Sequence, residues 1–167
     1  MVSRDAESRS GPAPDGQVRI EPSNWRDLNA LRELERICFP LDAWPLLDLV
    51  GVLTLPAVVR LKAVVNGKMV GFVAGDVRRS QKLTLIATIG VLPEYRGRGI
   101  GSTLLRECEE QAGMPIVRLN VRISNRVAIH MYERMGYQVV SRWPRYYQDG
   151  EDALVMEKHR YNNVYGD

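Results

Sequence analysis

The segment that decides the fold is Val91-Leu-Pro-Glu-Tyr-Arg-Gly-Arg-Gly-Ile-Gly-Ser102. It follows a β-branched run and precedes apolar residues at helical spacing, so it predicts a strand that turns directly into a helix. The start of a helix has unpaired backbone N–H groups and a positive dipole end, which together bind anions. Three alternate glycines let a pyrophosphate approach that backbone, and two arginines add positive charge. These residues are Gly97, Gly99, Gly101, Arg96 and Arg98.

The same segment has other interpretations. A turn that merely needs flexible residues explains one glycine well, but it explains three alternate glycines beside two arginines poorly. The dinucleotide-binding fingerprint needs a glycine where Ser102 stands, and the P-loop needs a lysine that is absent here. A pyrophosphate site of another kind is therefore the prediction.

Length and composition predict one domain. The 167 residues are 45% hydrophobic, which suits a single buried core. Residues 1–16 are almost free of apolar side chains and predict a disordered tail, residues 17–158 form the domain, and 159–167 form a second tail. No run of eighteen apolar residues and no secretory signal is present in the sequence, so we expect a cytoplasmic protein without a membrane segment.

Charge and cysteine content favour no special partner. Lys and Arg number 23 against 20 Asp and Glu, an excess too small to predict direct nucleic-acid binding, and no recognition motif accompanies it. Cys38 and Cys108 are far apart and lack nearby histidines, so we expect reduced structural thiols and no metal site.

Periodicity along the chain predicts a mixed α/β domain. Its sheet is mostly antiparallel and becomes parallel around the helix that begins after Gly99. Asn66-Gly67 predicts a hairpin turn, Asn125 a helix cap and Gly136 a helix end. The expected strands are 18–20, 57–65, 68–77, 83–91, 116–122, 137–140 and 153–158, and the expected helices begin at 28, 100 and 126, with a short helix or buried loop at 46–55.

The chain resembles the GNAT N-acetyltransferases in this glycine-rich segment and beyond it. Arg96-Gly-Arg-Gly-Ile-Gly101 matches that family's [RQ]xxGx[GA] motif, and the match runs from about Val18 to Lys158. The resemblance is to the branch that acetylates ribosomal-protein alanines and other protein N-termini. It implies the GNAT fold, in which two central strands splay apart. The further matching segments are Cys38-Phe-Pro40, Leu119-Asn-Val-Arg-Ile-Ser-Asn125, Ala128-Ile-His-Met-Tyr132, Met135-Gly-Tyr137, Tyr146-Tyr147 and Glu151-Asp-Ala153.

The resemblance implies acetyl-coenzyme A as cosubstrate. Backbone groups of Ile89, Gly90 and Val91 would pair with the pantetheine arm, and Asn125 would hydrogen-bond it. The pyrophosphate would lie on the turn into the helix. The implied set is Ile89, Gly90, Val91, Arg96, Gly97, Arg98, Gly99, Ile100, Gly101, Ser102, Asn125, Ala128 and Tyr132.

Two residues are implied in the chemistry. Tyr132 matches the tyrosine that protonates the leaving thiolate, although a tyrosine at this helix position also suits the core. Asn120 stands where relatives carry a glutamate or histidine base, and an amide can only position a water. An α-amine has a reference pKa about 2.5 below that of lysine, so its deprotonation near pH 7 costs about 3.5 kcal/mol less and tolerates a weak base better. His130 should point to another helix face.

The implied substrate contacts lie in two segments. Phe39, Pro40 and Leu41 would face Tyr146 and Tyr147 across a slot for the first residue of a peptide. The alternative is that these aromatics close the core, but adjacent tyrosines cannot both face inward on a strand, so at least one should be accessible. For Asp42 and Glu35 the alternatives remain open: each could be the partner of an ammonium group, part of a relay, or a solvated helix or loop charge.

The predicted activity is acetyl transfer to a primary amine, most simply the α-amine of a protein or peptide such as a ribosomal protein, by direct attack in a ternary complex. Two alternatives remain: acetylation of a small-molecule amine on the same fold, and an acetyl-coenzyme A-binding module without turnover, which the missing base would suggest. Trp25, Trp44 and Trp143 are expected to close the core or its edges. The oligomeric state is left open.

Overall fold

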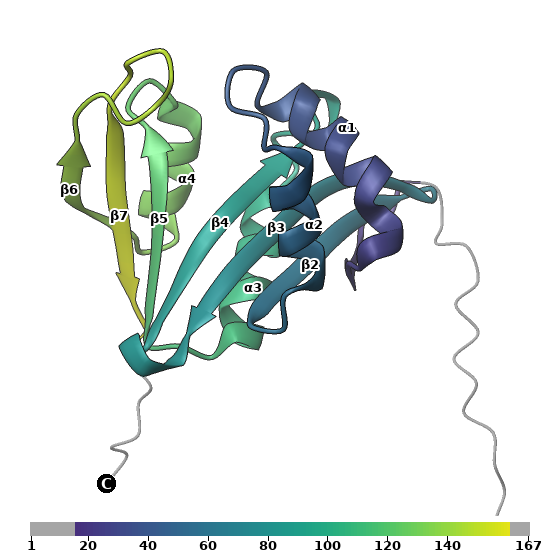
Figure 1. Cartoon of the computed structure of the whole chain (residues 1–167), viewed down its shortest axis with the longest axis horizontal. Helices are drawn as coiled ribbons and strands as arrows, with labels where there is room; N and C mark the ends of the chain where they lie inside the picture. Colours follow the sequence, from purple (N-terminus) through teal and green to yellow (C-terminus); the bar gives the residue numbers. More distant parts are fainter. Residues whose placement is uncertain (1–15, 161–167) are drawn as a thin grey trace, which may run out of the picture.

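A computed structural model describes residues 16–160 of the chain. Apart from Gly16 and residues 159–160, the two predicted tails lie outside the described residues. The described chain forms one seven-stranded sheet in the order β1-β2-β3-β4-β5-β7-β6, with α1 and α2 on one face and α3 and α4 on the other (Figure 1). The strands are β1 (Arg19–Pro22), β2 (Val58–Val65), β3 (Lys68–Arg78), β4 (Leu83–Val91), β5 (Ile116–Arg122), β6 (Gln138–Trp143) and β7 (Ala153–His159). The helices are α1 (Leu28–Cys38), α2 (Leu46–Thr54), α3 (Ile100–Ala112) and α4 (Arg126–Arg134), with 3-10 turns at Trp25–Asp27, Arg79–Gln81 and Pro93–Tyr95.

The core lies on both faces of β3, an inner strand between β2 and β4. Residues 69–75 of this strand are all buried, which explains why its apolar run does not alternate. Phe72 is fully buried, and so is Leu104 of α3. A Cβ added at Gly75 would lie 2.9 Å from the Cys108 Sγ, so this glycine lets α3 pack directly against the strand.

The strand pairing confirms a mostly antiparallel sheet. The β2–β3 hairpin turns at Asn66 and Gly67, whose φ angles of 48° and 77° are those of the predicted tight turn. All strand pairs are antiparallel except β4 and β5, which run parallel on either side of the connection through α3. The predicted change of direction around this helix is confirmed.

The sheet splits between β4 and β5. The two strands pair only where Leu83–Leu85 meets Ile116–Arg118, although β4 continues to Val91 and β5 to Arg122. Beyond the last pair they diverge, and Figure 1 shows the widening gap between the two halves of the sheet. A bulge at Ala87, between the pairs Ala74–Thr88 and Gly75–Ile86, adds a residue to β4 just where the divergence begins.

Residues 46–54 form a helix, the first of the two predicted alternatives. Two local expectations change. The strand β6 extends to Trp143, into the predicted loop. Of the two places expected for Trp25, the core or its edge, the core is wrong: Trp25 begins a 3-10 turn and is 66% exposed, with the Arg26 guanidinium 5.5 Å from its ring centre. Among the described residues, no helix is long and apolar enough to cross a membrane.

Candidate active site

The widening gap between β4 and β5 is lined by unpaired strand backbone. The Leu92 N–H donates to the Val70 carbonyl of β3 over 2.8 Å. Because backbone groups alternate in direction along a strand, Gly90 also faces β3, whereas the N–H and C=O groups of Ile89 and Val91 face the gap. Of the three predicted pantetheine contacts, Ile89 thus presents both its N–H and its C=O to the gap, and Val91 presents its N–H, because the Val91 carbonyl already accepts the Arg96 Nε. Gly90 instead provides space, since a Cβ at this position would lie 3.2 Å from Phe39.

The glycine-rich turn presents unpaired donors beside the same gap. Gly97 and Gly99 have φ angles of 76° and 78°, and Gly99 caps the 13-residue helix α3. The first helical bond runs from the Thr103 N–H to the Gly99 carbonyl, so the N–H groups of residues 100–102 have no acceptor within the helix. These three donors and the helix dipole suit a phosphate group.

The two arginines of the turn are exposed and bound to its own backbone. The Arg96 Nε donates to the Val91 carbonyl over 2.8 Å, and the Arg98 Nη2 donates to the Glu94 carbonyl over 3.2 Å. They therefore stiffen the turn as well as supply charge. Ile100 is buried in the core, so only its backbone faces the turn, and the Ser102 hydroxyl donates to the Gly99 carbonyl over 3.0 Å.

Helix α4 brings Asn125, Ala128 and Tyr132 to the opposite side of the gap. The Asn125 Oδ1 accepts the Ala128 N–H over 3.2 Å, which confirms the predicted cap and leaves the Asn125 amide N–H groups free. Ala128 is half-buried. Tyr132 is 5% exposed, and burial, with a smaller contribution from Tyr147, raises its pKa well above the ordinary value. A tyrosine in this state is protonated at neutral pH and can act only as a proton donor.

Asn120 faces the side of the sheet covered by α1 and α2. Its neighbours Leu119 and Val121 point to the other side and are buried. The Asn120 Nδ2 donates to the Tyr146 hydroxyl over 3.3 Å, and its Oδ1 is buried without a hydrogen-bond partner among the described residues. Asn120 is thus connected to the β6–β7 loop and retains one free acceptor.

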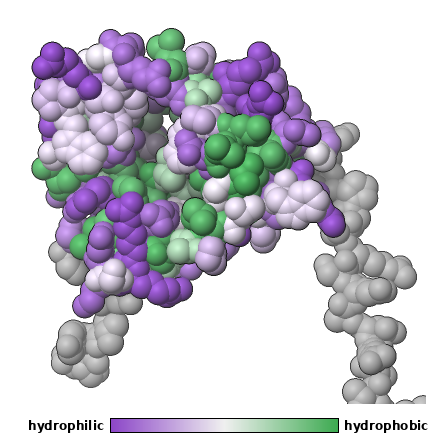
Figure 2. All heavy atoms as spheres, viewed as in Figure 1, coloured by the Kyte–Doolittle hydropathy of each residue, from purple (hydrophilic) through white to green (hydrophobic). Residues whose placement is uncertain are grey.

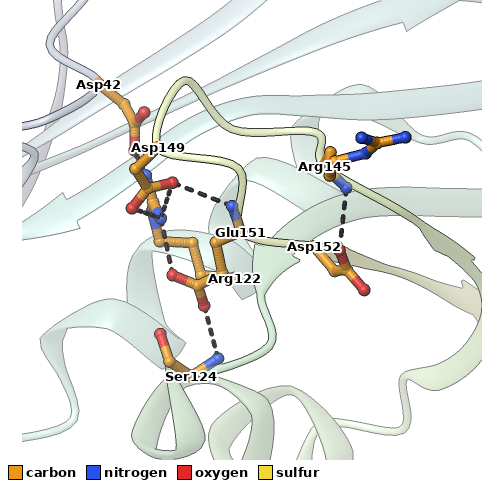
Figure 3. A network of polar contacts seen from close by, with 7 residues as sticks. All are labelled: Asp42, Arg122, Ser124, Arg145, Asp149, Glu151 and Asp152. Atoms are coloured by element: carbon orange, nitrogen blue, oxygen red, sulfur yellow. Dashed lines mark hydrogen bonds and ion pairs between the residues drawn. The ribbon is translucent and has the colours of Figure 1, made fainter.

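An ion-pair network around Arg122 joins three segments of the chain (Figure 3). The Arg122 Nε donates to Asp42 in the α1–α2 loop over 3.0 Å, and its Nη1 donates to Asp149 and Glu151 of the β6–β7 loop over 2.9 and 2.7 Å. The guanidinium also lies 4.0 Å from the centre of the Tyr147 ring. Both predicted substrate segments are therefore held against β5 by one side chain.

The β6–β7 loop presents a connected set of aromatic rings. Tyr146 is 49% exposed and Tyr147 is half-buried, so the prediction of an accessible tyrosine is confirmed. The two rings meet edge to face at 5.0 Å, and Trp143 contacts Tyr146 at 5.4 Å. Burial raises the pKa of Tyr147 to about 12. In the facing segment, Phe39 is half-buried, and Pro40 and Leu41 are exposed.

Three polar residues to which the sequence assigned no definite role lie near the gap in the structure. Arg122 and Asp42 form the network just described, and Glu35 is 1% exposed on α1. Glu35 had a signal, because it lies four residues after Leu31 on the apolar helix face. His130 is exposed and lies 3.1 Å from Glu133, as predicted for a surface residue. Within residues 16–160, no group of His, Cys, Asp and Glu side chains could hold a metal ion.

Comparisons with known proteins agree with this arrangement. Residues 28–137 match the Acetyltransferase (GNAT) family. An uncharacterized N-acetyltransferase of Methanocaldococcus jannaschii is 34% identical over 82% of this chain and 88% of its own length. An N-alpha-acetyltransferase of Sulfurisphaera tokodaii is 30% identical over 90% of this chain and 96% of its own length. The crystal structure of the ribosomal-protein-S18-alanine N-acetyltransferase of Escherichia coli superposes with a TM-score of 0.79 at 26% identity, covering 90% of this chain and 100% of that one.

A split mixed sheet with a glycine-rich anion turn beside the split defines an acyl-transfer enzyme that uses a coenzyme A thioester. The chain belongs to the GNAT acetyltransferase family and is an acetyl-coenzyme A-dependent N-acetyltransferase.

Proposed function

We propose that this enzyme acetylates the N-terminal α-amine of a protein or peptide in the cytoplasm, by direct attack of the amine in a ternary complex. The observation that carries the proposal is the Arg122 network. It joins the α1–α2 loop and the β6–β7 loop across β5. The proposed substrate slot lies between these two loops, beside the gap between β4 and β5.

The cosubstrate fits the opposite side of the same gap. The pyrophosphate would accept hydrogen bonds from the turn at 97–102, and the pantetheine arm would pair with the gap-facing backbone of Ile89 and Val91, with Asn125 as a further donor. Acetyl-coenzyme A supplies the activated acetyl carbonyl. This arrangement leaves the thioester at the bottom of the gap, near Tyr132, whose hydroxyl would protonate the leaving thiolate.

The slot suits a peptide terminus better than a small polyamine. Tyr146 and Tyr147 offer flat surfaces for one residue, which a polyamine lacks. The neighbouring carboxylates outnumber the single guanidinium, which favours the ammonium group of either kind of substrate. Exposed apolar residues continue beyond the slot in the α1–α2 segment, where Leu41, Leu46 and Leu47 are 63%, 48% and 82% exposed. Figure 2 shows such apolar surface beside the indentation between the two halves of the molecule, where a longer chain would lie.

The relatives support the α-amine. One is named an N-alpha-acetyltransferase, and a structural neighbour acts on the alanine of ribosomal protein S18. The lower reference pKa of an α-amine fits a site in which Asn120 replaces a charged base, because less free energy is needed to reach the neutral nucleophile.

The test is thiol release from acetyl-coenzyme A with peptides that differ only in the first residue, an N-terminally blocked lysine peptide and a polyamine. We expect turnover on free N-termini, and we expect Tyr132→Phe to lower kcat about 100-fold with little change in either KM. Tyr137→Phe is the matched control. Its ring lies 5.8 Å from that of Tyr132, but its hydroxyl is bound to Glu109, so it should reduce stability and leave the chemical step intact.

Turnover only on the polyamine or the blocked lysine peptide would contradict the α-amine proposal. Tight acetyl-coenzyme A binding with no turnover on any amine would instead identify a binding module.

A further inference from the structure

Two glutamates are fully buried in this domain, and they differ in their partners. Glu109 is 2% exposed, and its two oxygens accept from the Tyr137 hydroxyl over 2.6 Å and the Lys158 Nζ over 2.7 Å. Glu35 is 1% exposed, and its Oε1 accepts from the Thr88 hydroxyl over 2.7 Å. Among residues 16–160, no donor is in hydrogen-bond geometry with the Glu35 Oε2 and no cation pairs with this carboxyl group, although the Trp44 backbone N–H lies near enough to act on it. Such burial is costly, so it calls for an explanation.

Glu35 lies beside the gap, one turn before the substrate segment. The Phe39 N–H donates to the Glu35 carbonyl over 2.8 Å, so the residue belongs to the last turns of α1. Its partner Thr88 directly precedes Ile89, whose backbone faces the gap. The Glu35 carboxyl group is therefore hydrogen-bonded, through its Oε1, to the strand that would hold the cosubstrate.

Thr88 and Asn120 lie at the same level on opposite sides of the gap. The last β4–β5 pair is Leu85 with Arg118. Thr88 is three residues further along β4, one of which is the bulged Ala87, and Asn120 is two residues further along β5. Both side chains are on the face covered by α1: Thr88 bonds to this helix, and Arg122, two residues after Asn120, bonds to the loop that follows it.

The Thr88 hydroxyl can relay a proton. It donates its own hydrogen to Glu35, which leaves lone pairs on its oxygen to accept a hydrogen bond from an amine or a water in the gap. A carboxylate at the end of such a pair can accept a proton, which the amide of Asn120 cannot do.

We propose that Glu35 is the proton acceptor of acetyl transfer and that Thr88 passes the proton to it from the incoming amine. The inference rests on the proposed acetyl transfer but not on which amine is used. The amine nitrogen forms the bond to the acetyl carbonyl carbon, and the carbon–sulfur bond breaks with its electron pair on sulfur. The nitrogen gives one proton to the Thr88 oxygen while the Thr88 proton moves to Glu35, and sulfur takes a proton from Tyr132. Glu35 then loses its proton to water, and Tyr132 regains one.

The electrostatic surroundings support this role. Burial raises the pKa of Glu35 above its ordinary value, against the lowering effects of the Thr88 hydrogen bond and of the Trp44 backbone N–H. A base with a raised pKa is closer to the operating pH and accepts a proton more readily. The elements around it offer few titratable groups. Helix α1 contributes the Cys38 thiol, whose pKa burial also raises, and β4 contributes the uncharged Thr88. Arg96 and Glu94, in the segment between β4 and α3, act on Cys38.

The test compares Glu35→Gln, Thr88→Val, the double variant and Thr88→Ser, using the best amine found for the wild type. We expect kcat near neutral pH to fall about 100-fold in Glu35→Gln and Thr88→Val, no further in the double variant, and only slightly in Thr88→Ser. The deficit should shrink as pH rises, because more amine is then neutral and solvent accepts its proton. Glu109→Gln is the control, which should lower the unfolding midpoint and keep the wild-type pH profile.

Other results would overturn the inference. If Glu35→Gln changes KM or the unfolding midpoint but its kcat–pH profile parallels that of the wild type, Glu35 only holds α1 on β4. If no amine reacts, the α-amine proposal fails separately, and acetyl-coenzyme A hydrolysis, in which water is the nucleophile, is measured in the same variants. Equal hydrolysis rates in the wild type and Glu35→Gln would also exclude the proton-acceptor role.

Discussion

The phosphate turn and the proposed substrate slot lie beside the same gap but are built in different ways. The turn is a continuous segment, 96–102, whose ligand donors are backbone N–H groups and whose side chains bond to neighbouring carbonyls at 91, 94 and 99. The slot is assembled from the α1–α2 loop, β5 and the β6–β7 loop. Its central contacts join Arg122 to residues 80 and 27 positions away in sequence.

This difference separates what the two regions require. A backbone site needs the right φ angles and little else, so it depends on glycine at a few positions and tolerates change around them. A slot formed by distant side chains depends on one central charge, and its loops lose their arrangement when this charge is removed. We therefore expect the two regions to fail independently. A change in the turn should abolish cosubstrate binding, and a change in the Arg122 network should weaken the binding of the amine substrate.

The largest effect is expected from Gly99→Val. The φ angle of 78° at this helix cap is unfavourable for a β-branched residue and costs about 1–3 kcal/mol, which the chain would relieve by moving the first turn of α3. The position itself is open, since the nearest atom to an added Cβ is the Ser102 Oγ at 3.9 Å, so folding should survive. We expect the Kd for coenzyme A, measured by calorimetry, to rise about 100-fold.

Gly113 at the other end of the same helix is the matched control. Its φ angle is 65°, and the nearest atom to an added Cβ is 4.0 Å away. Gly113→Ala should cost about 1 kcal/mol of stability and leave the Kd within about twofold. A similar loss of affinity in both variants would show that helix stability, not the turn, controls binding.

A smaller effect is expected from Arg122→Ala. Removal of the guanidinium leaves three carboxylates facing one another and frees both loops, whose side chains are only partly exposed, at 24%, 40% and 22% for Asp42, Asp149 and Glu151. We expect kcat/KM for a peptide to fall about 30-fold, or about 2 kcal/mol, mainly through KM. The Kd for coenzyme A should stay within about twofold.

Arg142→Ala provides the comparison for that variant. Arg142 also pairs with a carboxylate of this region, Asp152, but it is 59% exposed and does not bridge to the α1–α2 loop. Exposed pairs contribute little, so peptide kinetics should hardly change. Loss of coenzyme A binding in Arg122→Ala would contradict the independence of the two regions.

The same contrast explains what could be predicted from sequence. The turn, the Asn125 cap and the Asn66-Gly67 hairpin are local patterns in which neighbouring residues determine the geometry, and all three have the predicted backbone. The strands were predicted from their β-branched runs, and the resemblance to GNAT enzymes implied that two central strands splay apart. These are properties that a short window of sequence contains.

The roles of Arg122, Asp42 and Glu35 are not contained in any such window. Arg122 lies within the segment 119–125, which assigns it no function, because its partners come from two loops that only the folded sheet brings together. Glu35 lay on an apolar helix face, but periodicity alone does not tell whether such a carboxyl is paired, as Glu109 is, or left with a free oxygen. The prediction for Trp25 was wrong for a related reason, because apolar character does not determine whether a residue in a turn packs against another element.

The smallest effect should be the acid sensitivity of the slot. Hydrogen bonds within the loop and from Arg122 hold the pKa of Asp149 below its ordinary value, and bonds from Ser124 and then Arg122 do the same for Glu151. Since both folded-state pKa values are lowered, the stabilisation is present above the unfolded values near 4 and is lost as pH falls through the folded ones. Trp143, which contacts Tyr146, can report this as fluorescence in a Trp25→Phe/Trp44→Phe background. We expect a constant signal from pH 8 to about 5 and a change below about 4.

In Arg122→Met one of the interactions that lower the pKa values of Asp149 and Glu151 is gone, so the fluorescence change should begin at higher pH. Identical curves for the two proteins would show that the network does not hold the loop.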